Sequence, residues 1–119
     1  MAVDELDALS GKFEGCRTLA FADLSAQMIL VTNSTSTLSR EVLDDLCAEA
    51  ILMLGLNGKM ALGTQPSTLA MVVGQNDMHV FVRSTIEPND ALCCICSSQI
   101  DLDAFLQDAR LCLERISGG

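Results

Sequence analysis

His79 is the single histidine of the chain, and it lies in an apolar segment two residues before Phe81. A histidine serves as a general base only where a nucleophile and an orienting group converge on it. None of the patterns G-x-x-x-x-G-K-[ST], G-x-G-x-x-G or G-x-S-x-G occurs in the sequence, and these patterns mark phosphate-binding loops and nucleophile elbows. The sequence therefore favours a packed or surface histidine, and we expect no enzyme.

Three of the six cysteines cluster in the segment Cys93-Cys94-Ile95-Cys96. Structural zinc sites usually combine two cysteine knuckles, and no second pair is present. In a strand, Cys94 and Cys96 would share one face while Cys93 points to the other. Free cysteines behave as small, often buried hydrophobes. The cluster favours core packing over metal or redox chemistry, so we expect no metal and no cofactor.

Carboxylates and arginines offer two further kinds of chemistry. Asp101 and Asp103 fall in the first turn of an expected helix, where the helix dipole stabilises them, and a calcium loop would need more oxygen ligands. An arginine donated to a GTPase could accelerate hydrolysis about 10³–10⁵-fold, but none lies in a recognisable finger loop. We expect surface ion pairs from the five arginines, which are Arg17, Arg40, Arg83, Arg110 and Arg115.

Composition limits the classes of partner and location. The chain of 119 residues contains 7 basic and 16 acidic side chains, which gives a net charge of −9, and half of all its residues are apolar. This size suits one hydrophobic core, so residues 1–119 are expected to form one domain. The acidity argues against nucleic acid and anionic membranes as partners. The acidic N-terminus lacks the apolar run of a signal peptide, so a cytoplasmic location with reduced thiols is expected.

Apolar spacing and turn residues predict the elements that position these groups. Two short apolar segments, 69–73 and 91–96, do not alternate apolar with polar residues, which is typical of strands buried on both faces. Short turns make the strands antiparallel. We predict a three-layer α/β/α fold with a five-stranded antiparallel sheet. The expected helices are 3–11, 40–54 and 101–116, with Gly11, Gly55 and Gly58 as stops and 59–66 as a connector, and the strands are 16–22, 27–33, 68–73, 78–83 and 91–97.

The central helix has more apolar surface than one sheet face can cover. At about 100° per residue, its apolar side chains spread over about 180°, from Val42 to Leu54. The opposite side is acidic, except for Leu52. Either the N-terminal helix or a second molecule must cover the excess. The uncharged segment 69–73 would also be an aggregation hazard as an unpaired edge.

The segments together resemble the Roadblock / dynein light chain family of profilin-like domains. The matching segments are Leu19-Ala20-Phe21-Ala22-Asp23 turning into Met28-Ile29-Leu30-Val31, the helix from Val42 to Leu54, Thr68 to Val73, the turn at Asn76-Asp77, His79 to Arg83, and Leu92 to Cys96 with the helix after it. The segments follow the element order α-β-β-α-β-β-β-α, and the resemblance implies dimers in which the central helices pack together and the third strands pair. It also implies a non-catalytic platform for Ras-like small GTPases, as activator or scaffold, or a light chain of a motor complex.

Two functions follow for testing. The first is a dimeric adaptor, a homodimer that binds a small GTPase or a signalling or motor complex. Its expected interface contains Val42, Leu46, Ala50, Met53, Leu69, Met71 and Val73. The second is a small-molecule sensor of the PAS or GAF type, which needs converging polar groups in a pocket; the candidates are Thr18, Thr32, Thr68 and His79.

Overall fold

The computed structural model describes residues 2–54 and 68–118. These residues form three helices and five strands in the order predicted from the sequence. The expected stops at Gly55 and Gly58 and the connector 59–66 lie outside the described residues. The elements are α1 (Ala2–Lys12), β1 (Cys16–Asp23), β2 (Met28–Thr32), α2 (Arg40–Met53), β3 (Leu69–Val73), β4 (Asp77–Arg83), β5 (Asp90–Ser97) and α3 (Leu102–Gly118).

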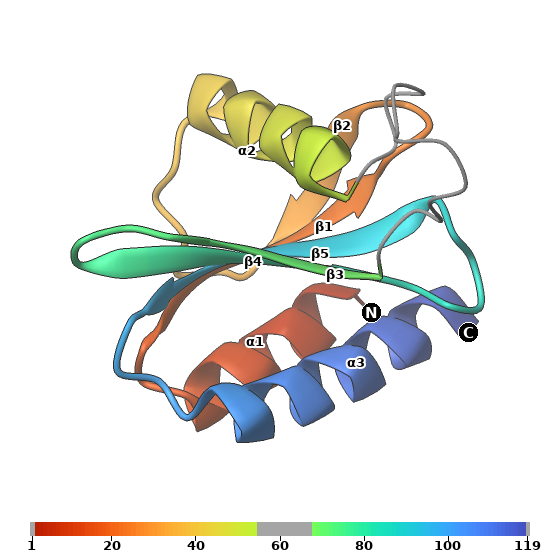
Figure 1. The fold of residues 1–119 in the computed structure, drawn as a ribbon. Helices are drawn as coiled ribbons and strands as arrows, with labels where there is room; N and C mark the ends of the chain where they lie inside the picture. Colours follow the sequence, from red (N-terminus) through yellow and green to blue (C-terminus); the bar gives the residue numbers. More distant parts are fainter. Residues whose placement is uncertain (1, 55–67, 119) are drawn as a thin grey trace, which may run out of the picture.

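The strands form one antiparallel sheet in the order β2-β1-β5-β4-β3. Helices α1 and α3 cover one face and α2 covers the other, which gives three layers (Figure 1). The predicted α/β/α fold class is confirmed. Strands β2 and β3 are the two edges of the sheet, and the C-terminal half of the chain contributes the β3 edge.

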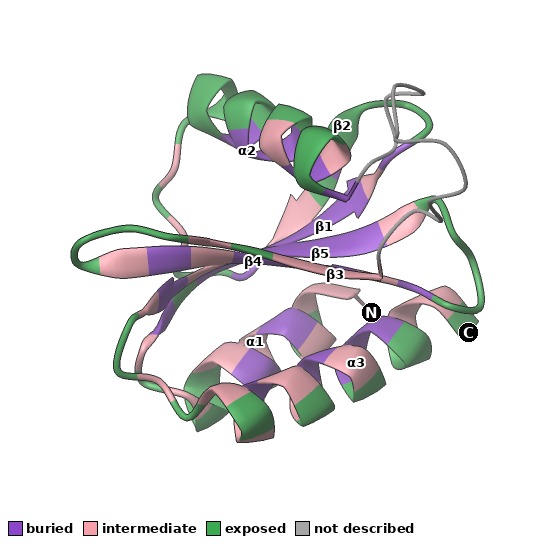
Figure 2. Cartoon of the chain, viewed as in Figure 1, coloured by how far each residue is buried: buried purple, intermediate pink, exposed green. Residues whose placement is uncertain are grey.

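Two cores, one on each face of the sheet, explain why the strands do not alternate. In β5, Cys94 and Cys96 pack into the core under α1 and α3, whereas Cys93 packs into the core under α2. All three are fully buried. Buried residues accordingly concentrate along the sheet and on the inner faces of the helices (Figure 2). The predicted split of the cysteine cluster between the two faces is confirmed.

Helix caps follow the sequence signals, with one correction. The Ser39 hydroxyl accepts a hydrogen bond of 3.3 Å from the Val42 N–H at the start of α2, and the Asp101 carboxylate accepts one of 3.3 Å from the Ala104 N–H at the start of α3. Gly11 was expected to end the first helix, but α1 continues to Lys12. Its packing, through Leu6 and Leu9, outweighs the weak helix propensity of one glycine.

Polar contacts fix α1 against its neighbours. Lys12 pairs with Asp108 of α3 at 2.5 Å and Glu5 pairs with Arg115 at 3.6 Å. These pairs border the apolar contact between the two helices. None of the helices in the described part of the chain combines the length and hydropathy needed to cross a membrane.

Candidate interaction surface

Strand β3 consists of apolar residues only, yet two of its large side chains are exposed to solvent. Met71 is 42% exposed and Val73 is 70% exposed. Met71 lies opposite Val80 and Val73 opposite Met78, and both partners belong to the core under α1 and α3. The two exposed side chains therefore point to the α3 side of the sheet. They stay uncovered because α3 packs on β5, two strands away.

The outer side of β3 also presents unpaired backbone groups. The Thr68 carbonyl accepts a hydrogen bond of 2.9 Å from the Arg83 N–H, and the Gly74 N–H donates one of 2.8 Å to the Asp77 carbonyl. In an antiparallel strand the residues alternate in the side to which they turn their backbone groups. The even-numbered residues of this segment thus turn their backbone N–H and C=O groups toward β4, and no strand within the described residues pairs with the other side. The residues whose backbone N–H and C=O groups point away from β4 are Leu69, Met71 and Val73.

The flank of α2 that looks toward β3 is also partly uncovered. Val42 is 43% exposed and Met53 is 41% exposed. Leu46 and Ala50, which were expected in the same interface, are 4% and 0% exposed. Both side chains pack into the core under α2 of this chain, whereas Val42 and Met53 leave part of their surface open.

A hollow of about 180 Å³ lies beside α2 on the same side of the sheet. In it, the Nδ1 atom of His79 pairs with the carboxylate of Glu49, and both side chains are about one-third exposed. His79 is thus engaged by α2 in an otherwise apolar wall, in keeping with a packed or surface role. The lining residues are Val42, Asp45, Leu46, Glu49, His79 and Ile95.

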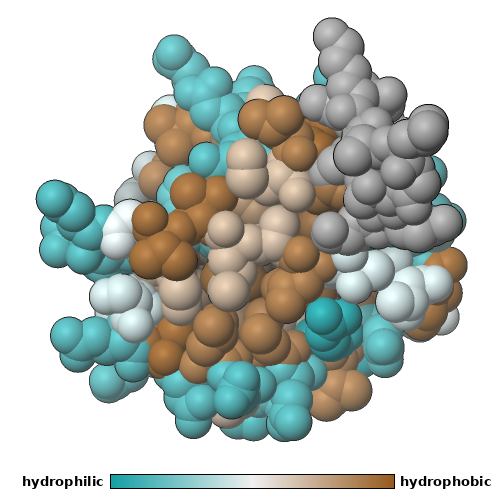
Figure 3. Space-filling view, viewed as in Figure 1, coloured by the Kyte–Doolittle hydropathy of each residue, from teal (hydrophilic) through white to brown (hydrophobic). Residues whose placement is uncertain are grey.

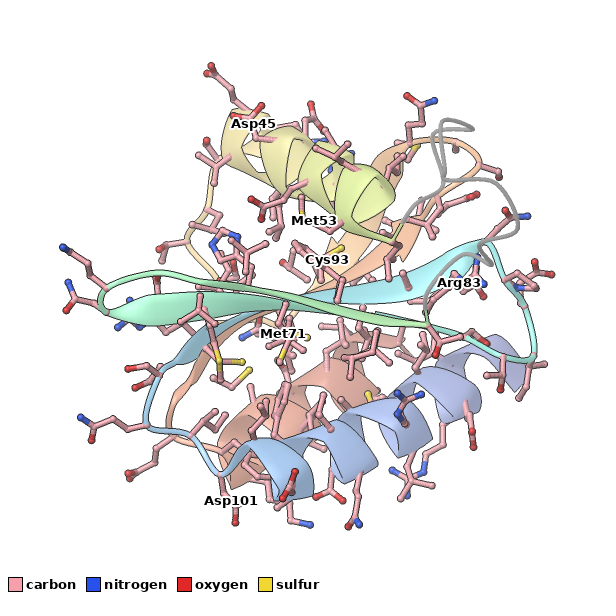
Figure 4. The ribbon with its side chains drawn as sticks, viewed as in Figure 1. Asp45, Met53, Met71, Arg83, Cys93 and Asp101 are labelled. Carbon is pink, nitrogen blue, oxygen red and sulfur yellow. The ribbon has the colours of Figure 1, made fainter. Side chains whose placement is uncertain are left out.

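These features form one continuous surface around the β3 edge. Apolar side chains lie both above and below the edge strand (Figure 3). Met53 lies on α2 above the sheet and Met71 on the edge strand (Figure 4). We call this the edge surface; it consists of Val42, Met53, Leu69, Met71 and Val73. All five belong to the seven residues expected in the dimer interface.

The packing of the even-numbered residues of β3 under α2 was not predicted from the sequence. Ala70 and Val72 pack against the core under α2, so they form the wall of the edge surface on that side. Successive side chains of a strand point to opposite faces of the sheet, so two faces could have been expected for β3. An unbroken apolar run does not indicate which of the two faces is exposed to solvent.

The cysteines and several arginines lie in the core and in ion pairs, respectively. All six cysteines are free and buried, and burial raises the pKa of Cys93 and Cys94. Three arginines form ion pairs, Arg17 with Asp77, Arg40 with Asp44, and Arg115 with Glu5. Within residues 2–54 and 68–118, no group of His, Cys, Asp or Glu side chains could hold a metal ion.

The polar groups needed by a sensor pocket do not converge. The Thr18 hydroxyl is buried and hydrogen-bonds the Ser36 hydroxyl at 3.2 Å. Thr32 ends β2 at one edge of the sheet, and Thr68 precedes β3 at the other. His79 faces Glu49 instead. These four side chains therefore do not meet around one common pocket.

The comparisons found proteins that are similar to this chain in structure but none that match it in sequence. No protein-family model matches the sequence, and no curated protein matches it. The structure is similar to a Roadblock/LC7 domain from Streptomyces avermitilis, with a TM-score of 0.78 and 8% identity over 96% of this chain and 92% of that one. It is similar to Myxococcus xanthus MglB, with a TM-score of 0.76 and 13% identity over 98% and 92%.

A profilin shares the architecture as well. LokiProfilin2, solved in complex with rabbit actin, matches with a TM-score of 0.63 and 13% identity over 95% of this chain and 92% of that one. The element order, the five-stranded antiparallel sheet and the helices on both of its faces agree with the expectation from the sequence. The chain therefore has the profilin-like fold of Roadblock/LC7 domains.

Proposed function

We propose that residues 1–119 form one domain of the Roadblock / dynein light chain family. The domain acts in the cytoplasm as a non-catalytic dimeric adaptor that binds a Ras-like small GTPase or a signalling or motor complex. The observation that supports this most is the outer side of β3, with which no other strand in residues 2–54 and 68–118 pairs and where Met71 and Val73 are exposed. A natural protein rarely leaves such an edge open, because it is a template for pairing with another chain.

In the proposed dimer, β3 pairs antiparallel with β3 of a second copy about a twofold axis at Met71. Met71 turns its N–H and C=O outward, so two copies of it can exchange both hydrogen bonds. On the α3 side, the two Met71 side chains then cover one another, and Val73 lies opposite Leu69 of the partner subunit. This contact satisfies every outward backbone group of β3.

The same axis brings the two α2 helices toward each other. Val42 and Met53 lie on the flank of α2 that looks toward the edge, and the hollow beside His79 lies between that flank and the sheet. A twofold interface uses the same patch on both subunits, so each copy would place its α2 flank against that of the other. In this dimer, the apolar side chains on both faces of the sheet, Val42 and Met53 on the α2 side and Met71 and Val73 on the α3 side, are shielded from water by the second copy.

The charge of the domain supports a basic partner surface. The outer side of α2 carries the exposed side chains Glu41, Asp44 and Asp45, and the chain has a net charge of −9. Dimerisation doubles this charge. Such a surface steers and orients a partner with clustered lysines or arginines.

Sedimentation equilibrium of Met71→Glu against Leu111→Glu tests the proposal. Leu111 is 49% exposed on α3, far from the edge, so it controls for a new surface charge. We expect a dimer for the wild type and Leu111→Glu, and a dimer weakened by on the order of 100-fold for Met71→Glu, because an unpaired charge would be buried. A wild type that is monomeric at tens of micromolar, which is above the micromolar range of dissociation constants, would contradict the dimer.

The adaptor role has its own measurement. Ras-like GTPases from the same genome are mixed with the wild-type domain, and binding and GTP hydrolysis are followed. We expect binding by one of them that is lost with Met71→Glu, and no GTP hydrolysis by the domain alone. Hydrolysis by the isolated domain would contradict the non-catalytic role.

A further inference from the structure

Cys16 and Cys96 lie opposite each other on the neighbouring strands β1 and β5. Cys16 begins β1, Cys96 lies near the end of β5, and the two are direct partners in the antiparallel ladder. Both side chains belong to the core under α1 and α3. The sequence drew attention to Cys96 through its neighbours but not to Cys16, which lies 80 positions earlier in the chain.

The backbone hydrogen bonds define the geometry of this pair. The Ser97 N–H donates to the Gly15 carbonyl at 2.7 Å, whereas the Cys16 N–H donates to the Phe13 carbonyl at 3.0 Å. Gly15 and Ser97 therefore form the hydrogen-bonded position, and Cys16 and Cys96 the neighbouring non-hydrogen-bonded one. At such positions the Cα atoms approach to about 4.5 Å and the side chains lie close, which is inside the range of about 4.4–6.8 Å that a disulfide needs.

The two thiols already interact in the reduced protein. The Cys16 thiol donates a hydrogen bond to the Thr18 carbonyl at 4.0 Å, and its closeness to the Cys96 thiol raises the pKa of Cys16 and lowers the pKa of Cys96. A lowered thiol pKa increases the fraction of thiolate, which is the form that reacts with peroxides. Burial slows this reaction, since Cys16 is 7% exposed and Cys96 is fully buried.

The strand end next to the pair is irregular and borders solvent. The ladder of β1 and β5 shifts register between Cys16 and Thr18. The adjoining residues Gly15, Arg17 and Ser97 line an open hollow of about 630 Å³ at the surface. A small oxidant thus needs to displace only the first residues of β1 to reach the thiols.

None of the other cysteines lies opposite a cysteine in the ladders of the described strands. Cys94 lies opposite Leu19. The Cys112 thiol donates to the Glu5 carbonyl at 3.6 Å, and burial raises the pKa of Cys112 to about 11. Cys47 and Cys93 lie in the other core, under α2.

We propose that Cys16 and Cys96 form a peroxide-sensitive dithiol that closes to a disulfide. Hydrogen peroxide oxidises one thiol of the pair to a sulfenic acid and releases one water molecule. The second thiol attacks that sulfur, the S–S bond forms and a second water molecule leaves. In sum, two thiols and one peroxide give one disulfide and two waters. The disulfide joins the beginning of β1 to the end of β5.

Mass spectrometry of the full chain treated with hydrogen peroxide tests the proposal. We expect a loss of about 2 Da, for two hydrogens, and four instead of six thiols that react with N-ethylmaleimide after unfolding; dithiothreitol restores both values. Trypsin should yield residues 13–17 linked to residues 84–110. Within the second peptide, fragmentation should place the link at Cys96.

Variants separate this pair from the other thiols. Cys16→Ala and Cys96→Ala should lose the 2 Da change, whereas Cys112→Ala, from the same core, should keep it. Six reactive thiols in the treated wild type, a link to Cys93, Cys94 or Cys112, or an unchanged 2 Da loss in Cys16→Ala would each overturn the proposal. Because the peptide link is read in the wild type, the test stands even if a variant fails to fold.

Discussion

Asn33 and Leu19 are joined by two hydrogen bonds of 3.0 Å. The Leu19 N–H donates to the side-chain oxygen of Asn33, and the Asn33 N–H donates to the Leu19 carbonyl. The Asn33 amide nitrogen also donates to the Thr35 hydroxyl at 3.0 Å. Asn33 is 1% exposed, so this side chain extends the pairing of β1 beyond the end of β2 and leads the chain toward α2.

Replacing Asn33 with alanine should leave the buried Leu19 N–H without an acceptor. We expect the free energy of unfolding in urea to fall by about 1–3 kcal/mol, the cost of an unsatisfied buried polar group. Asn76→Ala, at an exposed turn, is the control and should change it by less than about 0.5 kcal/mol. Equal stability of the two variants would mean that the Asn33 contacts contribute nothing.

Asp7 should make stability depend on pH in acid. The hydroxyl and the N–H of Ser34 both donate to its carboxylate, each at 2.6 Å, and they lower the pKa of Asp7 below the ordinary value of 3.8. A lowered folded-state pKa means that this stabilisation is present above about pH 4 and is lost as pH falls through the folded value. The melting temperature of Asp7→Asn should lie below that of the wild type at pH 6, and the two should converge near pH 2.

Ser34→Ala is the matched variant for this contact, because it removes the hydroxyl donor and keeps the carboxylate. It should show the same convergence in acid with a smaller difference at pH 6. A difference between Asp7→Asn and the wild type that stays constant from pH 6 to pH 2 would show that the Asp7 carboxylate is not the titrating group.

Two glycines near the start of the chain should respond to alanine in opposite directions. Gly11 lies inside α1 with no atom near the position of a Cβ, so Gly11→Ala should stabilise the fold by about 0.5–1 kcal/mol through helix propensity. At Gly15 a Cβ would lie 3.2 Å from the Ser97 Cβ and 3.4 Å from the Ile100 Cβ. Gly15→Ala should therefore lower the melting temperature, and a rise would contradict the tight approach of β1 and β5.

The element order could be predicted because local signals and burial agree along the chain. The non-alternating segments at β3 and β5 indicated a sheet with helices on both faces, and β5 lies between two cores as expected. Ser39 and Asp101 cap their helices through the side chains that the sequence suggested. These features depend on residues close together in the sequence.

The exposed surface could be predicted only in part. A helical wheel gave the apolar arc of α2, but it cannot show where the sheet beneath ends, so it did not separate the buried Leu46 and Ala50 from the exposed Val42 and Met53. The pairing of Cys16 with Cys96 was out of reach for another reason. It depends on the register between β1 and β5 and on the shift at the beginning of β1.

The most direct measurement of the central claim is disulfide cross-linking of Met71→Cys and Val73→Cys under mild oxidation, read on a non-reducing gel. All native cysteines are buried, so the new thiol is the exposed one. With the twofold axis at Met71, its two copies lie about 5.5 Å apart between Cα atoms, whereas two copies of Val73 are offset by about 13 Å. The proposed dimer predicts a covalent dimer for Met71→Cys and little for Val73→Cys; a Met71→Cys protein that stays monomeric, or that cross-links no faster than Leu111→Cys, would contradict it.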